Sequence, residues 1–242
     1  GSVFQNPRTQ FFTIDTTSEL AFGSENQGLP EADIVQRIYA TTECFSVKKL
    51  LGKNIFQLSG GEKQKIACAS VSVTDPQVIV LDEPSSNLDI TATKDLRGMI
   101  EIWKSQGKTI IVAEHRLYYL ADLIDRAVYL QDGRIAADFS GQEMKLLSSE
   151  KLKEMGLRSF ELSQYPIKHV RPLDNEVITL SDFYFAYQKD KAALHIPSLV
   201  LPKHSVIALI GHNGAGKSTL ARCLCGLEKH CRGIVSIAGK QY

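Results

Sequence analysis

The sequence has no apolar run of the roughly eighteen residues that a membrane-spanning helix needs, so no such helix is expected. Its formal net charge is only +1, which argues against a strongly basic surface for nucleic acid or acidic membranes. The five cysteines are scattered and form no C-x-x-C pair, which disfavours a zinc site and favours reduced cytosolic thiols. No signal peptide is visible and the first residue is not methionine, so we expect a piece of a longer protein.

What the 242 residues do contain is strand-length apolar runs that alternate with helical patterns. This alternation predicts an α/β fold with a mainly parallel sheet. Continuously apolar runs predict buried strands at 78–81, in KTIIVAEH at 108–115, and in SVIALI at 205–210.

The clearest helical pattern lies at 90–107. Leu96, Ile100 and Trp103 recur there on one face, at the spacing of an α-helix. Gly107 fits the first position beyond the helix, where a left-handed residue commonly ends it.

Antiparallel structure and a linker are expected farther along the chain. Residues 126–139 flank an Asp-Gly pair, which predicts a β-hairpin. Residues 141–174 are polar, rich in lysine and glutamate, and contain two prolines, which predicts a short helical extension and then a linker. A β-like alternation returns at residue 176. The sequence therefore divides into two segments, with a boundary near residue 172.

A glycine-rich stretch, GHNGAGKST, fits the pattern G-x-x-x-x-G-K-[ST] between an expected strand and an expected helix. Glycines let backbone N–H groups wrap around phosphate oxygens, and the helix N-terminus adds partial positive charge. Lys217 is expected to reach the β- and γ-phosphates, and Ser218 to bind Mg²⁺. The alternative is a glycine-rich turn without a ligand. The expected nucleotide-binding residues are Gly211, His212, Asn213, Gly214, Ala215, Gly216, Lys217, Ser218 and Thr219.

A second pair of glycines follows a serine in LSGGEKQK, which begins at Leu58. Ser59 and Glu62 have the spacing of a capping box at the start of a helix. Gly60 and Gly61 each cost about 0.5–1 kcal/mol relative to alanine in a helix, which the capping box alone does not explain. Close approach of a phosphate to the free serine hydroxyl and bare backbone amides explains them, so this stretch predicts a second anion-binding surface.

Acidic and imidazole side chains follow the first two expected strands. Asp82 and Glu83 end the strand at 78–81, and His115 ends the next one. Ligands bind at the carboxyl edge of an open parallel sheet, so these side chains are candidates for metal binding and catalysis. The alternatives are that the two acids merely solvate a strand end and that the histidine is a surface residue.

LSGGEKQK closely resembles the signature motif of ABC ATPases, whose commonest form ends in glutamine where this chain has Glu62. The resemblance implies that Asp82 is the Walker B acid that holds Mg²⁺ and that Glu83 is the general base. It also implies that His115 is the switch histidine at the γ-phosphate. The signature residues are Leu58, Ser59, Gly60, Gly61 and Glu62.

Three further motifs match the same family. SSNLD resembles the D-loop, which runs along the partner domain, and Asp89 also has the position of a helix cap. Gln5 in VFQNP matches the Q-loop glutamine, which senses Mg²⁺ and the γ-phosphate. The resemblance therefore gives Gln5 both a catalytic role and a role in metal binding. Tyr187 matches the aromatic residue that stacks on adenine, while simple strand alternation is the other explanation of this tyrosine. The D-loop residues are Ser86, Asn87, Leu88 and Asp89.

The order of these motifs differs from that of one ABC domain, in which the adenine aromatic and the phosphate loop come first. The resemblance therefore implies the last two-thirds of a first ABC domain at 1–140 and the first third of a second at 175–242. A helical extension and linker join them at 141–174. The expected fold is α/β: a P-loop NTPase of the ABC type with a mainly parallel sheet, a helical signature subdomain and an antiparallel β element.

Two arrangements follow from this order. In one, the phosphate loop and the signature of this chain are the two faces of one composite ATP site in a tandem protein. In the other, residues 175–242 dock onto residues 1–140 as a circularly permuted domain. We hypothesise the docked arrangement, because the strand at 205–210 needs neighbours to bury its faces and so short a segment buries little surface alone.

The stretch VFQNPRTQFFTIDTTSELAFGSENQGLP resembles the ATPase subunits of energy-coupling-factor transporters, which import vitamins and cobalt or nickel into bacteria. The resemblance implies ATP and Mg²⁺ as ligands and a peripheral place at the cytoplasmic face of the membrane. The implied partners are a transmembrane subunit, a substrate-binding membrane subunit and a second ABC ATPase domain, with no nucleic acid. Phe11 and Phe12 are expected either in the groove that receives the transmembrane subunit or in the core.

Two other functions remain as alternatives. A soluble ABC ATPase acting on ribosomes or DNA is disfavoured by the short linker, the lack of a long coiled coil and the near-neutral charge. A non-hydrolysing ATP-binding regulatory module is disfavoured because Glu83 and His115 are both present. The transported substrate does not follow from this chain, since a separate membrane subunit selects it.

Overall fold

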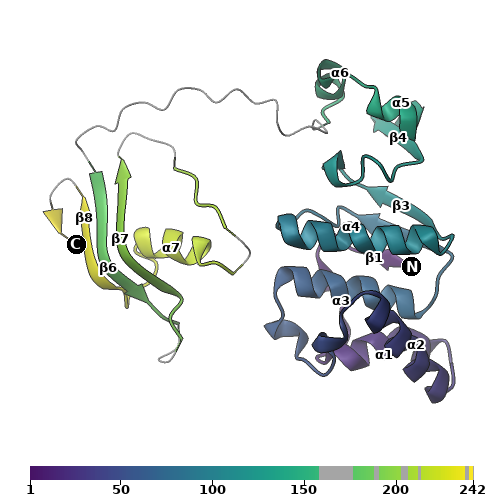
Figure 1. The fold of residues 1–242 in the computed structure, drawn as a ribbon, viewed down its shortest axis with the longest axis horizontal. Helices are drawn as coiled ribbons and strands as arrows, with labels where there is room; N and C mark the ends of the chain where they lie inside the picture. The colour runs from purple at the N-terminus through teal and green to yellow at the C-terminus, as the bar shows by residue number, and fades with distance from the viewer. Residues whose placement is uncertain (158–176, 188–190, 203–206, 212–213, 238–239, 242) are drawn as a thin grey trace. The chain divides into compact units, whose positions relative to one another are not determined.

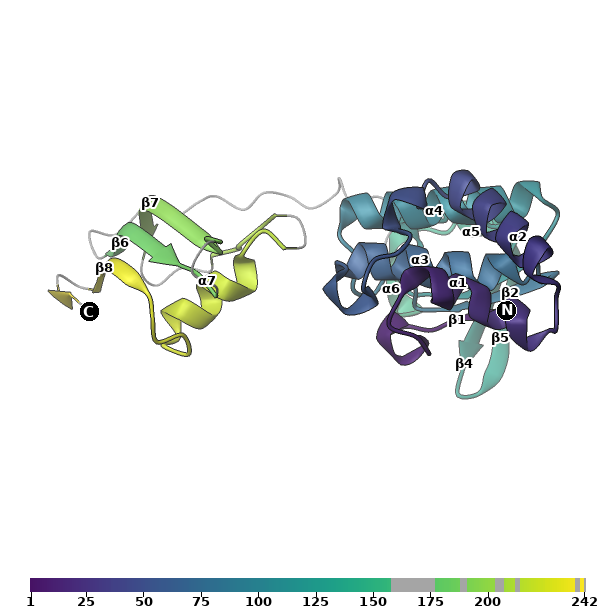
Figure 2. The same cartoon turned by 90° about the horizontal axis from the view of Figure 1, so that it is seen from below.

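The computed structural model describes residues 1–157, 177–187, 191–202, 207–211, 214–237 and 240–241. The chain divides into two compact units, Gly1–Tyr165 and Pro166–Tyr242 (Figure 1, Figure 2). Each unit has a hydrophobic core of its own.

A parallel three-stranded sheet lies at the centre of unit 1. Its strands are β1 (Ser2–Val3), β2 (Val78–Asp82) and β3 (Thr109–Ala113), in the order β1-β2-β3. The register pairs Asp82 at the end of β2 with Ala113 at the end of β3. Because the strands are parallel, the residues that follow each of them meet at one edge of the sheet.

Helices cover one face of this sheet (Figure 2). Helices α3 and α4 pack against each other and against the strands, and α1 and α2 pack on α3. The helical region expected around the signature stretch is therefore confirmed. The helices of unit 1 are α1 (Thr16–Asn26), α2 (Glu31–Cys44), α3 (Gly60–Val73), α4 (Ile90–Ser105), α5 (Gly141–Lys145) and α6 (Ser149–Glu154).

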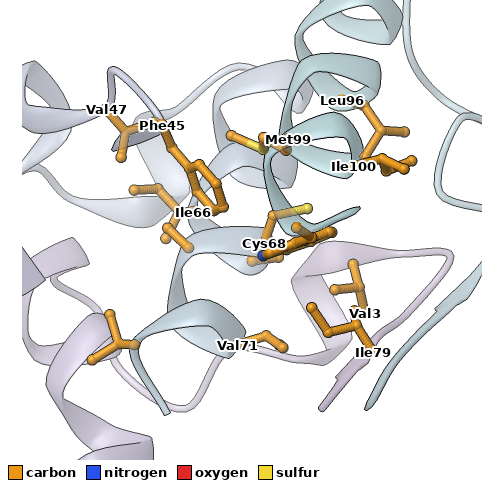
Figure 3. Close-up of a cluster of buried hydrophobic side chains, with 14 of the residues drawn as sticks. Val3, Phe45, Val47, Ile66, Cys68, Val71, Ile79, Leu96, Met99 and Ile100 are labelled. Carbon is orange, nitrogen blue, oxygen red and sulfur yellow. The ribbon is translucent and has the colours of Figure 1, made fainter. Parts of the chain in front are cut away.

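The core of unit 1 lies between α3, α4 and the sheet (Figure 3). Trp103 on α4 is fully buried, and its indole N–H donates a 2.7 Å hydrogen bond to Ser72 Oγ on α3. The ring of Phe45 meets the indole edge-on, with 5.7 Å between ring centroids. Leu96 and Ile100 are buried in the same core, so the predicted apolar face of this helix is confirmed.

The end of α4 also follows the prediction. Gly107 has a φ of 75°, the left-handed conformation that glycine adopts without steric cost. The N–H groups of Gly107 and Lys108 donate to the carbonyls of Lys104 and Trp103, which are the two hydrogen bonds of a Schellman motif.

The predicted hairpin is formed by β4 (Arg126–Gln131) and β5 (Arg134–Ser140), which pair antiparallel. Its turn residues Asp132 and Gly133 have φ values of 51° and 72°. Two successive positive φ values characterise the type I′ turn that Asp-Gly favours, so the prediction is confirmed.

Strand β2 is buried on one face only. Ile79 and Leu81 have no exposed surface, whereas Val78 and Val80 are 45% and 39% exposed. Ile111 on β3 is 53% exposed on the same side of the sheet as Val80, its register partner. The prediction of fully buried strands at 78–81 and 108–115 is therefore wrong for this face. A parallel sheet needs cover on both faces, and the helices of unit 1 cover one.

Two strand edges in unit 1 face a cavity. Among the residues that the structure describes, β3 pairs only with β2, and β4 pairs only with β5. A cavity of about 490 Å³ lies between β3 and β4, lined by Ile110 and Val112 on one side and by Ala127 and Tyr129 on the other. We call this cavity the edge slot.

Unit 2 is an antiparallel sheet packed on one helix, α7 (Lys217–Leu224). The predicted alternation from residue 176 and the helix after the glycine-rich stretch are confirmed as β6 and α7. The strands, in spatial order β7-β6-β8-β9, are β6 (Val177–Phe185), β7 (Leu194–Pro202), β8 (Arg232–Ile237) and β9 (Lys240–Gln241). The core residues are Leu180, Phe183, Phe185, Leu194, Leu220 and Cys223.

The buried strand expected at 205–210 is wrong for the described part of that segment. Residues 207–210 form no strand, and Ile207, Leu209 and Ile210 are 41%, 40% and 89% exposed. All the described strand pairs of unit 2 are antiparallel, so this unit offers no parallel neighbour for such a strand.

The helical extension expected after the hairpin is present as α5 and α6, while the linker at 158–174 lies outside the described residues. The domain limits at 140 and 175 stay predictions. Of the helices in the described ranges, none combines the length and the apolar character needed to cross a membrane.

Candidate functional site

Three of the expected catalytic residues meet at the carboxyl edge of the parallel sheet. The side-chain amide of Gln5 donates a 2.8 Å hydrogen bond to Glu83 Oε2. The Nδ1 atom of His115 lies 3.8 Å from Glu83 Oε1. These residues follow β1, β2 and β3 respectively, so the parallel topology brings them together. The side chains of Glu83 and His115 are 39% and 40% exposed, which leaves them accessible to a ligand.

The backbone at Glu83 is strained. Its φ of 38° lies in the left-handed region, which costs a non-glycine residue on the order of 1 kcal/mol. The N–H of Glu83 donates 2.9 Å to the carbonyl of Ala113, and its own carbonyl accepts 3.1 Å from the N–H of Ser86. These bonds hold the turn that follows β2. Asp82 is the last residue of β2, and its side chain is exposed. Such strain concentrates at functional sites, where the surrounding structure fixes the direction of a side chain.

A buried carboxylate that sequence reasoning missed lies directly behind this group. The side chain of Glu114 is only 1% exposed. It accepts hydrogen bonds from Ser85 Oγ at 2.6 Å and from the hydroxyl of Tyr119 at 3.0 Å. The available signal was an acid directly after an apolar strand, the same signal that singled out Asp82.

The D-loop stretch leads from Glu83 into α4. Asp89 caps this helix, since its Oδ1 accepts a 2.9 Å hydrogen bond from the N–H of Ala92, so the capping prediction is confirmed. Asn87 donates a 3.3 Å hydrogen bond to Ser86 Oγ, and Leu88 packs partly buried against the core. The contact of this stretch with a partner domain stays a prediction.

The signature stretch begins α3 with the predicted capping box, in which Ser59 and Glu62 exchange hydrogen bonds. The hydroxyl of Ser59 is not free as expected, because it donates a 2.8 Å hydrogen bond to Glu62 Oε2. A Cβ on Gly61 would lie 2.9 Å from the Cβ of Ala92 on α4, so helix packing explains this glycine. A Cβ on Gly60 would meet nothing within 4 Å, so packing does not explain this glycine, and the approach of a phosphate to it stays a prediction.

Glu62 brings a negative charge to that surface. The hydrogen bonds from the backbone N–H and the hydroxyl of Ser59 lower the pKa of Glu62, so its carboxylate is ionised at neutral pH. Leu58, just before the helix, is buried. An incoming phosphate at the start of α3 would therefore meet a carboxylate where the commoner signature motif has a neutral amide.

The phosphate-loop residues lie in unit 2, before and within the first turn of α7. Gly211, Gly214 and Gly216 have φ values of 149°, 83° and 90°, so all three need the conformational freedom of glycine. A Cβ on Gly216 would also lie 2.8 Å from the side chain of Leu194. The Nζ atom of Lys217 donates 2.8 Å to the carbonyl of Gly211, which closes the loop. His212 and Asn213 lie outside the described residues, and Ala215, Ser218 and Thr219 lie within them.

Tyr187 lies beside the phosphate loop in the same unit. Its hydroxyl is 3.5 Å from Thr219 Oγ1, and its ring meets Phe185 edge-on at 4.8 Å between centroids. Tyr187 lies beyond the end of β6 and is 60% exposed, so simple strand alternation does not account for it. An exposed aromatic face next to a phosphate loop fits the stacking of a base.

The predicted residues thus form two groups, one in each unit. Gln5, Glu83 and His115 belong to unit 1, with the signature stretch, and Tyr187 belongs to unit 2, with the glycine-rich loop. In the described ranges no three metal-binding side chains gather at one point. Mg²⁺ commonly takes one or two protein oxygens, several waters and phosphate oxygens, so a carboxylate like Asp82 and a hydroxyl like Ser218 fit this ion.

The sequence model of the ABC transporter family matches residues 1–86 and 194–242, which is more than half of the chain. An ABC transporter ATP-binding protein of Treponema denticola is 42% identical over 99% of this chain and 50% of its own length. A counterpart from Sulfurisphaera tokodaii is 31% identical over 100% of this chain and 50% of its own length. The chain spans about half the length of the curated relatives it matches.

Solved structures share the fold. CbiO1 from Clostridium perfringens, part of the ABC transporter complex CbiONQ, aligns over 60% of this chain and 58% of its own. Its TM-score is 0.55 at 31% identity. MJ1267, an ATP-binding cassette of an ABC transporter, aligns over 65% of this chain and 68% of its own, with a TM-score of 0.56 at 24% identity.

The residues that the family model matches include Asp82 and Glu83, the capped glycine pair and the loop before α7. The parallel sheet, its helical layer and the antiparallel strands are those of an ABC ATPase. The chain belongs to the ABC transporter family of ATP-binding proteins.

Proposed function

We propose that this chain hydrolyses ATP and thereby powers an importer of the energy-coupling-factor type. The observation that carries the proposal is the group at the sheet edge, where Gln5 bonds to Glu83 and His115 lies 3.8 Å from the same carboxylate. A glutamate, a glutamine and a histidine on three neighbouring strand ends supply a base, an orienting amide and a second polar contact for one water molecule.

In this mechanism Glu83 accepts the proton of the attacking water. The amide of Gln5 holds one carboxylate oxygen, which leaves the other on the side of His115. Bound Mg²⁺ supplies charge neutralisation for the β- and γ-phosphates, and Asp82 and Ser218 are the residues that would hold it. The loop at 211–219 binds the phosphates through backbone N–H groups, and Tyr187 stacks on the adenine.

An exposed apolar surface on unit 1 supports the proposal that this chain binds a transmembrane subunit. Phe12 is 75% exposed and stacks on Phe22 with 4.8 Å between ring centroids. Ile14 and Phe56 are 63% and 69% exposed. Phe11, by contrast, packs against the core, so only Phe12 of the predicted pair is offered to a partner. Clustered apolar side chains at a surface mark sites of protein contact.

The likeness to CbiO1, described as part of a transporter complex, supports the type of importer. Its partners are then a transmembrane subunit, a substrate-binding membrane subunit and a second ABC ATPase domain. The chain works at the cytoplasmic face of a bacterial membrane, and the cargo is a vitamin, cobalt or nickel. A soluble ABC ATPase of ribosomes or DNA, and a non-hydrolysing regulatory module, are the competing functions.

Two measurements separate these functions. Co-purification with coexpressed transmembrane subunits should be weakened by Phe12→Ala and not by Val35→Ala, which removes an exposed apolar side chain from α2. Equal retention of both variants, or recovery with ribosomes instead, would count against the importer. ATP turnover should be lost in Glu83→Gln, and unchanged turnover would refute the base assignment.

We also propose that residues 175–242 dock onto residues 1–140 as a circularly permuted domain, in which the segment 205–210, whose described part forms no strand in unit 2 by itself, adds to the edge slot as a strand. The apolar side chains of Ile207, Leu209 and Ile210 are exposed in unit 2, and β3 and β4 each keep one edge without a strand partner in the described residues. A strand parallel to β3 would deliver the loop at 211–219 to the sheet edge that carries Glu83.

A cross-link tests this arrangement. With the exposed Cys44 and Cys225 changed to serine, the pair Asp82→Cys and Lys217→Cys should form a disulfide within one chain. This needs Cα atoms within about 7 Å. The pair Glu31→Cys and Lys217→Cys is the control and should stay reduced. A monomer without the cross-link, or a cross-link found only in dimers, would overturn the proposal.

A further inference from the structure

Glu114 has four hydrogen-bond donors around a side chain that is 1% exposed. Its Oε2 accepts from Ser85 Oγ at 2.6 Å and from the hydroxyl of Tyr119 at 3.0 Å. Its Oε1 accepts from the backbone N–H groups of His115 at 2.9 Å and Arg116 at 3.0 Å. One carboxylate therefore joins the segment after β2 to the turn after β3.

Both joined segments carry a residue of the proposed hydrolytic site. Ser85 is fully buried and comes two positions after Glu83, and the turn after β3 begins at His115. A second link runs alongside, since the guanidinium of Arg116 donates 3.2 Å to the carbonyl of Ser85. The contacts of Glu114 and Arg116 thus join the segments that carry Glu83 and His115, in addition to the backbone bond from Glu83 N–H to the carbonyl of Ala113.

The carboxylate of Glu114 also faces the imidazole of His115. Its Oε1 lies 3.6 Å from His115 Nδ1, on the same nitrogen that lies 3.8 Å from Glu83 Oε1. These distances are too long for hydrogen bonds but close enough for charge attraction. Two carboxylates beside Nδ1 favour a proton on that nitrogen and leave Nε2 as the acceptor.

A purely structural role explains only part of this arrangement. A buried carboxylate needs hydrogen-bond donors, and burial together with the charge of Glu114 raises the pKa of Tyr119, so this hydroxyl stays a donor. That need does not account for the charge being placed beside the reactive imidazole.

We propose that Glu114 is a positioning residue of the hydrolytic site. It ties Ser85 to the turn at His115 and selects the imidazole tautomer with its proton on Nδ1. The expected effect of Glu114 on catalysis rests on the proposed ATP hydrolysis, whereas its expected effect on the tautomer of His115 does not.

Nitrogen-15 spectra of the histidine rings test the tautomer in the 242-residue chain, with His115→Asn used for assignment. Glu114→Gln keeps the shape of the side chain and removes the charge, and should shift the tautomer ratio of His115 toward Nε2–H by roughly threefold or more. Tyr119→Phe removes one donor, keeps the charge and should leave the ratio unchanged. An unchanged ratio in Glu114→Gln overturns the proposal.

Steady-state ATP turnover gives the second readout. Glu114→Gln should lower kcat about tenfold with KM for ATP unchanged, because binding groups are untouched while the reacting groups are misplaced. If Glu114→Gln does not fold, Ser85→Ala removes only the hydrogen bond between Ser85 and Glu114. This variant should lower kcat without changing the tautomer ratio of His115. An unchanged kcat would overturn the positioning role of this hydrogen bond. Should the wild-type chain not hydrolyse ATP, the proposed function fails, and the histidine spectra still decide the role of Glu114.

Discussion

The side-chain amide of Gln5 holds the carboxylate of Glu83 by a 2.8 Å hydrogen bond between residues 78 positions apart in sequence. The bond leaves Glu83 Oε1 on the side of His115. It also links the loop after β1 to the residue that follows β2.

Replacing Gln5 by glutamate should disable the proposed site without unfolding the chain. The amide donor would become a second negative charge beside Glu83, and we expect kcat to fall about 10- to 100-fold. The position is exposed, so the free energy of unfolding should change by less than about 0.5 kcal/mol. Gln10→Glu is the control: it adds the same charge nearby and keeps the oxygen that accepts from Phe4 N–H. Equal turnover in the two variants would show that the bond has no role.

Trp103→Ala should destabilise unit 1 strongly. The indole is fully buried, meets Phe45 edge-on and bonds to Ser72, so its loss leaves a cavity and an unpaired hydroxyl. We expect a cost of about 3–5 kcal/mol, and a smaller cost for Trp103→Phe, which fills most of the space. Urea unfolding followed by circular dichroism measures both, and a cost below about 1 kcal/mol for the alanine variant would contradict this packing.

Gly216→Ala should abolish nucleotide binding by unit 2. The residue has a φ of 90°, and a Cβ would lie 2.8 Å from Leu194 Cδ2 and 3.2 Å from the carbonyl of Ala193. The matched control is Gly226→Ala, at a φ of 70° with nothing within 4 Å of the added atom. Binding of a fluorescent ATP analogue should be lost only in the first variant. Similar losses in both would mean that backbone strain alone is responsible.

The ion pair between Arg97 and Asp122 should make stability depend on pH in a defined window. Two hydrogen bonds of 2.6 and 2.8 Å from the guanidinium lower the pKa of Asp122 to about 2 in the folded chain. An unfolded aspartate has a pKa of about 3.9, so the contribution is complete above about pH 4 and is lost as pH falls through about 2. The pair is half-exposed, so the contribution is below about 1 kcal/mol.

Thermal unfolding of wild type and Asp122→Asn between pH 6 and pH 2 checks this window. The difference in Tm should be constant from pH 6 to about pH 4.5 and shrink below it. Glu25→Gln controls for the change in net charge. A difference that persists at pH 2 would show that the asparagine acts through packing and not through the ion pair.

Features coded within a short stretch were predicted correctly. Gly107, the capping box at Ser59 and the turn at 132–133 each depend on residues within a few positions of one another. The meeting of Gln5, Glu83 and His115 was implied by the family resemblance, and parallel topology accounts for it.

Two of the errors concern partners that lie far away in sequence. Whether Val80 is buried depends on what covers the second face of the sheet, and whether 207–210 forms a strand depends on a parallel neighbour. Glu114 was missed because the burial of its side chain depends on Ser85, 29 positions away, as well as on Tyr119, five positions away. The free hydroxyl expected at Ser59 was wrong because the capping-box carboxylate takes it as a donor.

In the docked arrangement proposed above, the edge of β3 that has no strand partner among the described residues has a consequence for biosynthesis. A nascent chain completes Ala113 about 90 residues before Ser205, which at about 5–20 residues per second amounts to roughly 5–18 seconds. During that interval the half-exposed Ile111 and the unpaired backbone beside it are a template on which another nascent chain can add a strand. Slow translation or scarce chaperones should therefore drive this chain into inclusion bodies before any loss of its folded stability.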